Sequence, residues 1–324
     1  MNLRLIMLKK FLSALLVPTL LLAGCGISSN KNDDKLDIVC TVFPAYDWTR
    51  HVAGDDPDVR ISYLLESGSD LHNFQPTADD IIRISDCDIF IYVGGESDAW
   101  VEDALSNARN KNMTVINLLD VLSDSLKEEE IKEGMEGHED CSHDDETEYD
   151  EHIWLSLNNA ERCVSEISRQ LGGANKDNAQ KYEENAAEYN AQLQLLDRSF
   201  HMLFDEKNDV MIFGDRFPFR YFTEDYGIDY YAAFPGCSAD TDASFETIAF
   251  LAGKADEVGA DTIFAIENSD CTIADAVVEN TAGKSAKIAV LDSIQSVSGK
   301  QIEDGATYLS IMDNNYQILK EAFQ

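Results

Sequence analysis

The densest group of metal-binding side chains lies in the segment HEDCSHDDETEYDEHIW, residues 138–154. It holds three histidines, one cysteine and eight carboxylates, and it turns abruptly apolar at Ile153 and Trp154. Imidazole, thiolate and carboxylate groups are the ligands that zinc takes from proteins, and imidazole and carboxylate also suit manganese. Because the two apolar residues are expected to enter a hydrophobic core, the sequence predicts that His152 is anchored to the folded body.

The acidic loop around this segment, about residues 127–151, also carries His138 and His143. A stretch with so many like charges cannot bury enough apolar surface to form a packed core. We therefore expect the loop to be disordered without metal.

Four positions, His152 among them, combine a metal-binding side chain with a place beside an apolar run. His72 lies in the loop after the run that ends near Leu65, His152 precedes IWLSL, Asp215 follows DVMIF and Glu267 follows ADTIFAI. Ligands of open parallel α/β sheets bind beyond the carboxyl ends of strands. Two imidazoles and two carboxylates are a donor set that zinc accepts tetrahedrally. We predict a metal site in a cleft, with two ligands from each half of the chain.

Eight short apolar, β-branched runs must position these side chains, and they alternate with helical patterns. Continuous apolar strands separated by helices indicate parallel sheets buried on both faces. The expected fold is α/β, with two lobes that each hold a mostly parallel β-sheet flanked by helices. The predicted strands are 36–43, 59–65, 87–93 and 113–118 in the first half, and 209–213, 229–234, 260–266 and 286–291 in the second.

A long helix is predicted between the two halves. Residues 175–207 contain neither glycine nor proline and are rich in Ala, Glu, Gln and Leu. About 30 helical residues would span roughly 45 Å, enough for a rigid strut that joins two lobes. An ordinary amphipathic helix within one domain is the alternative. The predicted units are an N-terminal lobe at 36–172, a linker helix at 173–207 and a C-terminal lobe at 208–324.

Helix starts are marked by capping residues. Thr77 with Asp80 and Thr272 with Asp275 both have the spacing of a capping box. Ser244 precedes the apolar pattern FETIAFLAGKADEVG and is expected to begin another helix.

The overall composition limits the partners of the protein. The chain has 324 residues, 44% of them hydrophobic, and 25 Lys+Arg against 61 Asp+Glu give a net charge of −36. The hydrophobic content is that of a globular protein. Nucleic acid is excluded as a partner because its binding depends on cations that neutralise phosphates. An acidic surface concentrates cations, which permits a cation-binding role without establishing one.

The N-terminus has the features of a secretory signal. A basic start and the apolar run FLSALLVPTLLLA lead to small residues, so residues 1–24 are predicted to be a signal peptide. The sequence LAGC resembles the bacterial lipobox, in which the cysteine, here Cys25, receives lipid and becomes the new N-terminus. Polar residues 25–35 would form a tether. The expected location is the extracytoplasmic face of the cell membrane, reached through the lipid anchor alone. A plain signal peptide with a chance cysteine is the alternative.

These motifs together resemble the substrate-binding lipoproteins of zinc and manganese ABC transporters. The matching features are the lipobox, SGSDLHNFQPTADDI, the histidine-rich acidic loop, YDEHIWLSLNNA, the long helix, FRYFTEDYGI and FAIENSD. The resemblance implies two lobes joined by a rigid helix, one metal ion between them and delivery of that ion by a monomer to an ABC permease. It also implies that His72 and His152 are the N-lobe ligands and that Glu267 is the last C-lobe carboxylate.

One position departs from the family pattern. In this family the third ligand, a histidine or glutamate, lies five residues before an aromatic residue that matches Tyr221. That position is Arg216 here, which cannot bind a metal ion. We predict its neighbour Asp215 as the third ligand, with Cys237 and Asp240 as alternative donors from FPGCSADTDAS.

Other roles stay open for Cys237. If Cys25 is lipidated, six cysteines remain, and outside the cytoplasm these permit disulfides in fifteen possible pairings. A disulfide with another strand-end cysteine such as Cys271, or a buried thiol, is the alternative to metal binding.

The metal itself is predicted from two opposing signals. Two histidines with two carboxylates resemble the manganese-type set, because oxygen donors suit manganese. His138 and His143 resemble the mobile loop that, in the zinc members, is proposed to gather metal, although a solvated acidic loop with incidental histidines is the alternative. We favour Zn²⁺ over Mn²⁺.

Two other functions are weighed against metal capture. A zinc-dependent hydrolase would keep one coordination position open for water beside a general base. The chain has no HExxH and no GxSxG motif, so we do not expect an enzyme. A metal-stabilised surface adhesin would need an exposed apolar binding surface.

Overall fold

The computed structural model of the protein describes residues 35–136, 148–204, 209–238 and 242–324, which fall within a single compact unit, Lys35–Gln324. No helix in these ranges is long and apolar enough to cross a membrane. Some predicted features lie outside the described residues: the signal peptide, Cys25, His138, His143 and Asp240.

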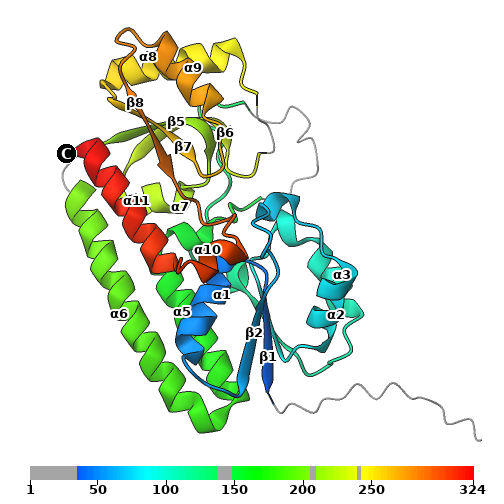
Figure 1. Cartoon of the computed structure of the whole chain (residues 1–324). Helices are drawn as coiled ribbons and strands as arrows, with labels where there is room; N and C mark the ends of the chain where they lie inside the picture. Colours follow the sequence, from blue (N-terminus) through cyan, green and yellow to red (C-terminus); the bar gives the residue numbers. More distant parts are fainter. Residues whose placement is uncertain (1–34, 137–147, 205–208, 239–241) are drawn as a thin grey trace, which may run out of the picture. The chain divides into compact units, whose positions relative to one another are not determined.

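Two parallel four-stranded sheets form the framework (Figure 1). Their strands are β1 (Leu36–Cys40), β2 (Val59–Tyr63), β3 (Ile89–Tyr92) and β4 (Thr114–Asn117), and then β5 (Val210–Phe217), β6 (Asp229–Pro235), β7 (Thr262–Ile266) and β8 (Lys287–Leu291). The strand orders are β2-β1-β3-β4 and β6-β5-β7-β8. Each order reverses beside its first strand, which is where open α/β sheets bind ligands. The predicted two-lobe α/β fold is confirmed, and all eight predicted strands are present. Strand β5 continues to Phe217, however, so Asp215 lies inside this strand and not after it.

Helices flank both sheets, and short 3-10 turns carry some of the loops between them. In the first half these elements are α1 (Phe43–Ala53), η1 (Leu71–Asn73), α2 (Ala78–Asp86), η2 (Glu96–Asp98), α3 (Trp100–Ser106), α4 (Leu118–Val121), η3 (Ile153–Leu155), α5 (Leu157–Ala174), η4 (Lys176–Asn178) and α6 (Ala179–Phe204). In the second half they are α7 (Arg220–Tyr226), α8 (Phe245–Val258), α9 (Thr272–Asn280), α10 (Gly299–Glu303) and α11 (Tyr308–Phe323).

The predicted long helix is present as α6, which has 26 residues and is therefore roughly 39 Å long. The 3-10 turn η4 precedes it, so the helix starts later than the composition predicts. Near its start, the Tyr182 hydroxyl donates to Asp56 Oδ2 of the first half at 2.5 Å. Near its end, the ring of Phe200 packs against the ring of Phe222 in the second half, with 5.0 Å between centroids. The helix therefore contacts both halves along its length.

Helix α11 makes a second connection, beside α6 (Figure 1). It packs against β8 of the second sheet and α1 of the first half. At its first residue, the Tyr308 N–H donates to Asp47 Oδ2 at 3.0 Å and the Tyr308 hydroxyl donates to Trp154 O at 2.5 Å. All three side chains are fully buried. The C-terminal helix is thus fastened to the N-terminal half.

The predicted helix caps are partly confirmed. Thr77 and Asp80 form the expected capping box, and Ser244 caps α8. The predicted box at Thr272 is wrong, because helix α9 already includes that residue. The Thr272 N–H instead donates to Asp270 Oδ1 at 2.8 Å.

Both ends of the acidic loop are ordered, which differs from the expectation for residues 127–151. Glu128 and Tyr149 form an antiparallel bridge, and the Glu136 N–H donates to Ala233 O of strand β6 at 2.9 Å. Backbone hydrogen bonds of this kind need no apolar side chains, so a charged segment can make them. Residues 127–136 therefore run from the first half onto the second half.

Gly214 allows close packing between β5 and α9. A Cβ at this position would lie 2.7 Å from Ala274 N and closer still to Ala274 Cα. Because backbone atoms cannot swing aside, we expect Gly214→Ala to lower the free energy of unfolding by about 3 kcal/mol. Gly253→Ala is the matched control, since Gly253 lies in α8 with nothing within 4 Å of an added Cβ. It should stabilise by about 0.5–1 kcal/mol. Thermal unfolding of both variants checks this, and equal melting temperatures would contradict it.

Candidate metal centre

The first imidazole is held by the turn that follows β2. His72 lies in η1, and Asp70 caps this turn by accepting the His72 N–H at 3.0 Å. His72 Nδ1 lies 2.8 Å from Ser97 Oγ and 3.7 Å from Glu151 Oε2. With Nδ1–H donating to Ser97, the lone pair of Nε2 is left for a metal ion.

The second imidazole is fixed by the hydrophobic core, as the sequence predicts. Ile153 and Trp154 form the buried turn η3, and Trp154 Nε1–H donates to Ser293 O at 2.7 Å. His152 itself is fully buried. Asp150 Oδ1 accepts the His152 N–H at 2.8 Å and lies 3.0 Å from His152 Nδ1. A carboxylate on Nδ1 orients the ring and leaves Nε2 facing away from it.

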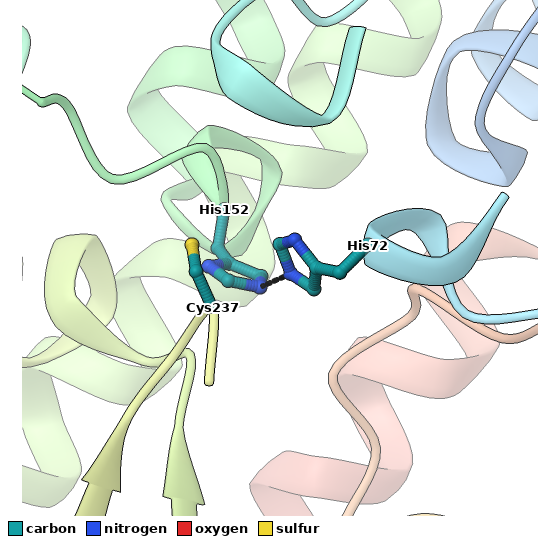
Figure 2. Close-up of side chains that lie close together, drawn as sticks. All are labelled: His72, His152 and Cys237. Carbon is teal, nitrogen blue, oxygen red and sulfur yellow. Dashed lines mark hydrogen bonds between the residues drawn. The ribbon is translucent and has the colours of Figure 1, made fainter. Parts of the chain in front are cut away.

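The two rings point toward each other, with their Nε2 atoms 3.1 Å apart (Figure 2). Cys237, in the turn after β6, completes a group in which one ligand atom from each residue lies within 4.8 Å of the others. His72, His152 and Cys237 are called the ligand cluster below. Gly236 allows the turn to approach, because a Cβ there would lie 3.0 Å from His152 Cε1 and 2.9 Å from Phe217 O. Two imidazoles and a thiol are typical zinc ligands.

The pKa values of the two histidines are shifted in opposite directions. Burial and the charge on His152 lower the pKa of His72 to about 3. Burial also disfavours the charged form of His152, but Asp150 and Glu151 outweigh it and hold the pKa of His152 above its ordinary value of 6.5. These shifts favour a charged His152 beside a neutral His72, and His152 Nε2 lies 3.1 Å from both His72 Nε2 and Gln295 Oε1.

The thiol of Cys237 is neutral without metal. Burial raises the pKa of Cys237 far above its ordinary value of 9.0, and Asp150 and Glu129 raise it further. A metal ion would replace this proton, because a coordinated thiol is deprotonated. Cys237 and Cys271 are both free thiols in this structure, so the disulfide considered from the sequence is not formed between them.

Gln295, in the loop after β8, is a neighbour that the sequence reasoning missed. Its Oε1 lies 3.1 Å from His152 Nε2, and its side chain is 2% exposed. Its Nε2 has no hydrogen-bond partner among the described residues. The rule that selected the other candidates, a polar residue beyond a strand end, applies to Gln295 as well. An amide is a less common metal donor than an imidazole or a carboxylate, so its residue type is a weak signal in the sequence.

The two predicted carboxylate ligands lie outside the ligand cluster. Asp215 Oδ2 accepts the Ile266 N–H at 3.3 Å, and Asp215 Oδ1 accepts the Arg216 N–H at 2.8 Å. Glu267 Oε2 accepts the Ser293 N–H at 2.7 Å, and Glu267 Oε1 accepts the Ser293 hydroxyl at 2.6 Å. Both carboxylates accept hydrogen bonds from backbone N–H groups and so stabilise the conformation of the neighbouring loops. Their role as ligands stays a prediction.

Two parallel α/β lobes whose strand-end loops converge on a set of nitrogen and sulfur ligands define a substrate-binding protein with a candidate metal centre. The profile of the family "Zinc-uptake complex component A periplasmic" (ZnuA) matches residues 38–322, so the chain belongs to this family. The resemblance predicted from the sequence motifs is thereby confirmed.

Individual relatives agree with this assignment. The chain is 29% identical over 311 residues to the high-affinity zinc uptake system protein ZnuA of Bacillus subtilis, covering 94% of each chain. It is 30% identical over 305 residues to the zinc-binding lipoprotein AdcA of Streptococcus pneumoniae serotype 4, covering 93% of this chain and 58% of AdcA. The chain thus spans little more than half of that relative. The Zn(II)-bound ZnuA-like domain of AdcA from Streptococcus pneumoniae superposes with a TM-score of 0.69 at 26% identity, over 89% of this chain and 99% of that one.

Proposed function

We propose that this protein captures Zn²⁺ outside the cytoplasm and delivers it to an ABC permease. The observation that supports this most is the 3.1 Å approach of two imidazole Nε2 atoms, with the thiol of Cys237 beside them. Each ring is held through its Nδ1 side by Asp150 or Ser97, so both are oriented before a metal arrives. The names of the relatives, which describe zinc uptake and zinc binding, support the same cargo.

The proposed ligands are His72, His152 and Cys237, with the side-chain oxygen of Gln295 as a fourth donor. Thiolate is a soft ligand that selects zinc over manganese, whereas manganese prefers oxygen donors. The presence of Cys237 therefore favours Zn²⁺ as cargo, with Mn²⁺ as the weaker alternative.

Capture rather than hydrolysis is the function we infer. A zinc hydrolase needs a water on the metal and a group beside it that can take a proton. In the proposed site Gln295, next to His152 Nε2, supplies the fourth protein donor, which leaves no coordination position for water. A site that is filled by protein donors holds an ion instead of activating water.

The anchoring is part of the proposal. We infer that lipid on Cys25 holds a monomer at the extracytoplasmic face of the membrane, with residues 25–35 as the tether. The AdcA relative is itself described as a lipoprotein. Mass spectrometry of the chain purified from membranes tests this, and an N-terminus that begins elsewhere or a Cys25 without lipid would contradict it.

Metal stoichiometry tests the proposed cargo. The chain is stripped with a chelator, dialysed against equal concentrations of zinc and manganese, and analysed by inductively coupled plasma mass spectrometry. We expect about one zinc and almost no manganese per chain, as for a single closed site. A chain that returns from dialysis without zinc would refute the proposal.

Zinc affinity should rise with pH, and its slope should change at the pKa of His152. Below this pKa, which lies above 6.5, zinc displaces about two protons, one from His152 and one from the Cys237 thiol. Above it, only the thiol proton remains, so about one is released. His72 contributes none, because its pKa lies at about 3. Calorimetry in buffers of different ionisation enthalpy counts these protons, and a count that does not change with pH would contradict the assignment.

A further inference from the structure

Arg216 occupies the position where the family pattern places a metal ligand. A guanidinium carries no lone pair for a metal and stays charged at any pH the protein meets. Its side chain is only 17% exposed, so most of the guanidinium side chain is covered by the protein. A permanent cation beside a site for a dication requires a physical reason.

The first contact of Arg216 reaches the loop that carries His72. Arg216 Nη2 donates to Asp70 Oδ2 at 2.7 Å, in an ion pair between the second half of the chain and the first. The other carboxylate oxygen, Asp70 Oδ1, accepts the His72 N–H at 3.0 Å and caps the turn η1. One carboxylate thus links Arg216 to the backbone of a proposed ligand.

The second contact reaches the loop that carries Cys237. Arg216 Nη1 donates to Ser238 O at 3.3 Å, and Ser238 is the buried neighbour of Cys237. The strand register explains this reach. A bulge in β5 between Phe213 and Arg216 restores pairing at Arg216 opposite Phe234, three residues before Cys237 on the neighbouring strand β6.

We propose that Arg216 is a positioning residue, which ties the His72 turn to the Cys237 loop and sets the distance between imidazole and thiolate before zinc binds. This inference rests on the proposed function, because it assigns Arg216 a role in that same site. The planar guanidinium offers several N–H donors in a fixed geometry, so it can hold two acceptors on different loops at once. In the proposed site Cys237, in the turn after β6, supplies the third ligand, and Arg216 on β5 is hydrogen-bonded to its neighbour Ser238.

The alternative is that Arg216 acts only through its charge, and the two roles predict effects of opposite sign. A cation near the site repels Zn²⁺, so its removal would tighten binding if charge were all that mattered. If Arg216 positions the two loops, its removal would weaken zinc binding, because contacts that orient metal ligands contribute about 10–100-fold to metal affinity.

The experiment compares zinc affinity of the whole chain by competition with a chromophoric chelator. The variants are Arg216→Gln, Arg216→Lys and, as a matched control, Arg220→Gln. Arg220 is similarly exposed, at 21%, and is paired with Glu130, but it contacts neither ligand loop through that pair. Cobalt(II) spectra of each variant report the thiolate–metal bond and the coordination geometry, which a general loss of stability would not change.

We expect Arg216→Gln to bind zinc about 10–100-fold more weakly than wild type and to show altered cobalt d–d bands, while Arg220→Gln matches wild type. Arg216→Lys keeps the charge but replaces the two donor nitrogens used here with a single one, so it should recover only part of the affinity. Equal or tighter zinc binding by Arg216→Gln would overturn the inference, as would full recovery by Arg216→Lys.

Two comparisons distinguish failure of the Arg216 inference from failure of the proposed function and from misfolding of the variant. If wild type and Arg220→Gln do not bind zinc, the proposed function fails; if they bind and Arg216→Gln binds equally, only the inference fails. Should Arg216→Gln not fold, Asp70→Asn breaks the same ion pair while keeping an acceptor for the His72 N–H. It should weaken zinc binding in the same way, and wild-type affinity in that variant would overturn the inference.

Discussion

The double variant His72→Ala, His152→Ala is expected to lose zinc binding by on the order of 10⁴-fold. A structural zinc ion is held by about 10–16 kcal/mol, so each of four ligands supplies roughly 2.5–4 kcal/mol if they share it evenly. Each tenfold in affinity is about 1.4 kcal/mol. The two imidazoles are the nitrogen donors of the ligand cluster, and their Nε2 atoms are 3.1 Å apart. Chelator competition measures the loss.

The control for this variant is His201→Ala, because His201 is exposed on α6, contacts Asp197 and Tyr226, and is not part of the ligand cluster. It should bind zinc like wild type. His152 is fully buried beside Asp150, so its removal leaves a buried carboxylate without its partner and destabilises the fold. The single variant His72→Ala therefore serves as a second measurement. Wild-type zinc affinity in a folded His72→Ala chain would contradict the proposed site.

Replacing Cys237 with serine should change which metal the protein prefers. Loss of the thiolate removes one donor, so zinc affinity should fall by about 10²–10³-fold. Manganese gains little from sulfur, so its affinity should change by less than about tenfold. The ratio of the manganese dissociation constant to the zinc dissociation constant, measured by competition in the same buffer, should therefore fall by at least about tenfold.

The matched control is Cys271→Ser, since Cys271 is the other partly exposed free cysteine among the described residues and is not part of the ligand cluster. It should keep the wild-type ratio. An unchanged ratio in Cys237→Ser would show that the third ligand lies elsewhere, and Asp215 would then become the first residue to test.

The fold and both imidazoles could be predicted from the sequence because they depend on local patterns. Continuous apolar runs predicted the eight strands, and the end of the second predicted strand predicted the place of His72. The apolar pair after His152 predicted its burial, since both Ile153 and Trp154 are core residues. None of this required knowledge of how the two halves pack.

The contacts of the two predicted carboxylate ligands could not be predicted from the sequence. Asp215 lies in the bulge of β5, where one extra residue changes the direction of the side chain, and a bulge leaves no reliable mark in a sequence. Glu267 is at a strand end as predicted, but Ser293 occupies both of its oxygens. Burial and Asp292 raise the pKa of Glu267 to about 8. A metal ion that bound Glu267 would have to displace this proton, as it would the thiol proton of Cys237.

The helices α6 and α11 have a consequence for how fast the ion leaves. Hinge closure requires a few residues that absorb large backbone rotations, whereas here each half is joined to the other along helices that pack on both. Exit of the ion then depends on how often a single short loop, the turn at His72 or the one at Cys237, detaches from its neighbours. The residence time of the ion would then be a property of these loops. A permease could shorten it by binding one loop while the remainder of the molecule keeps its conformation.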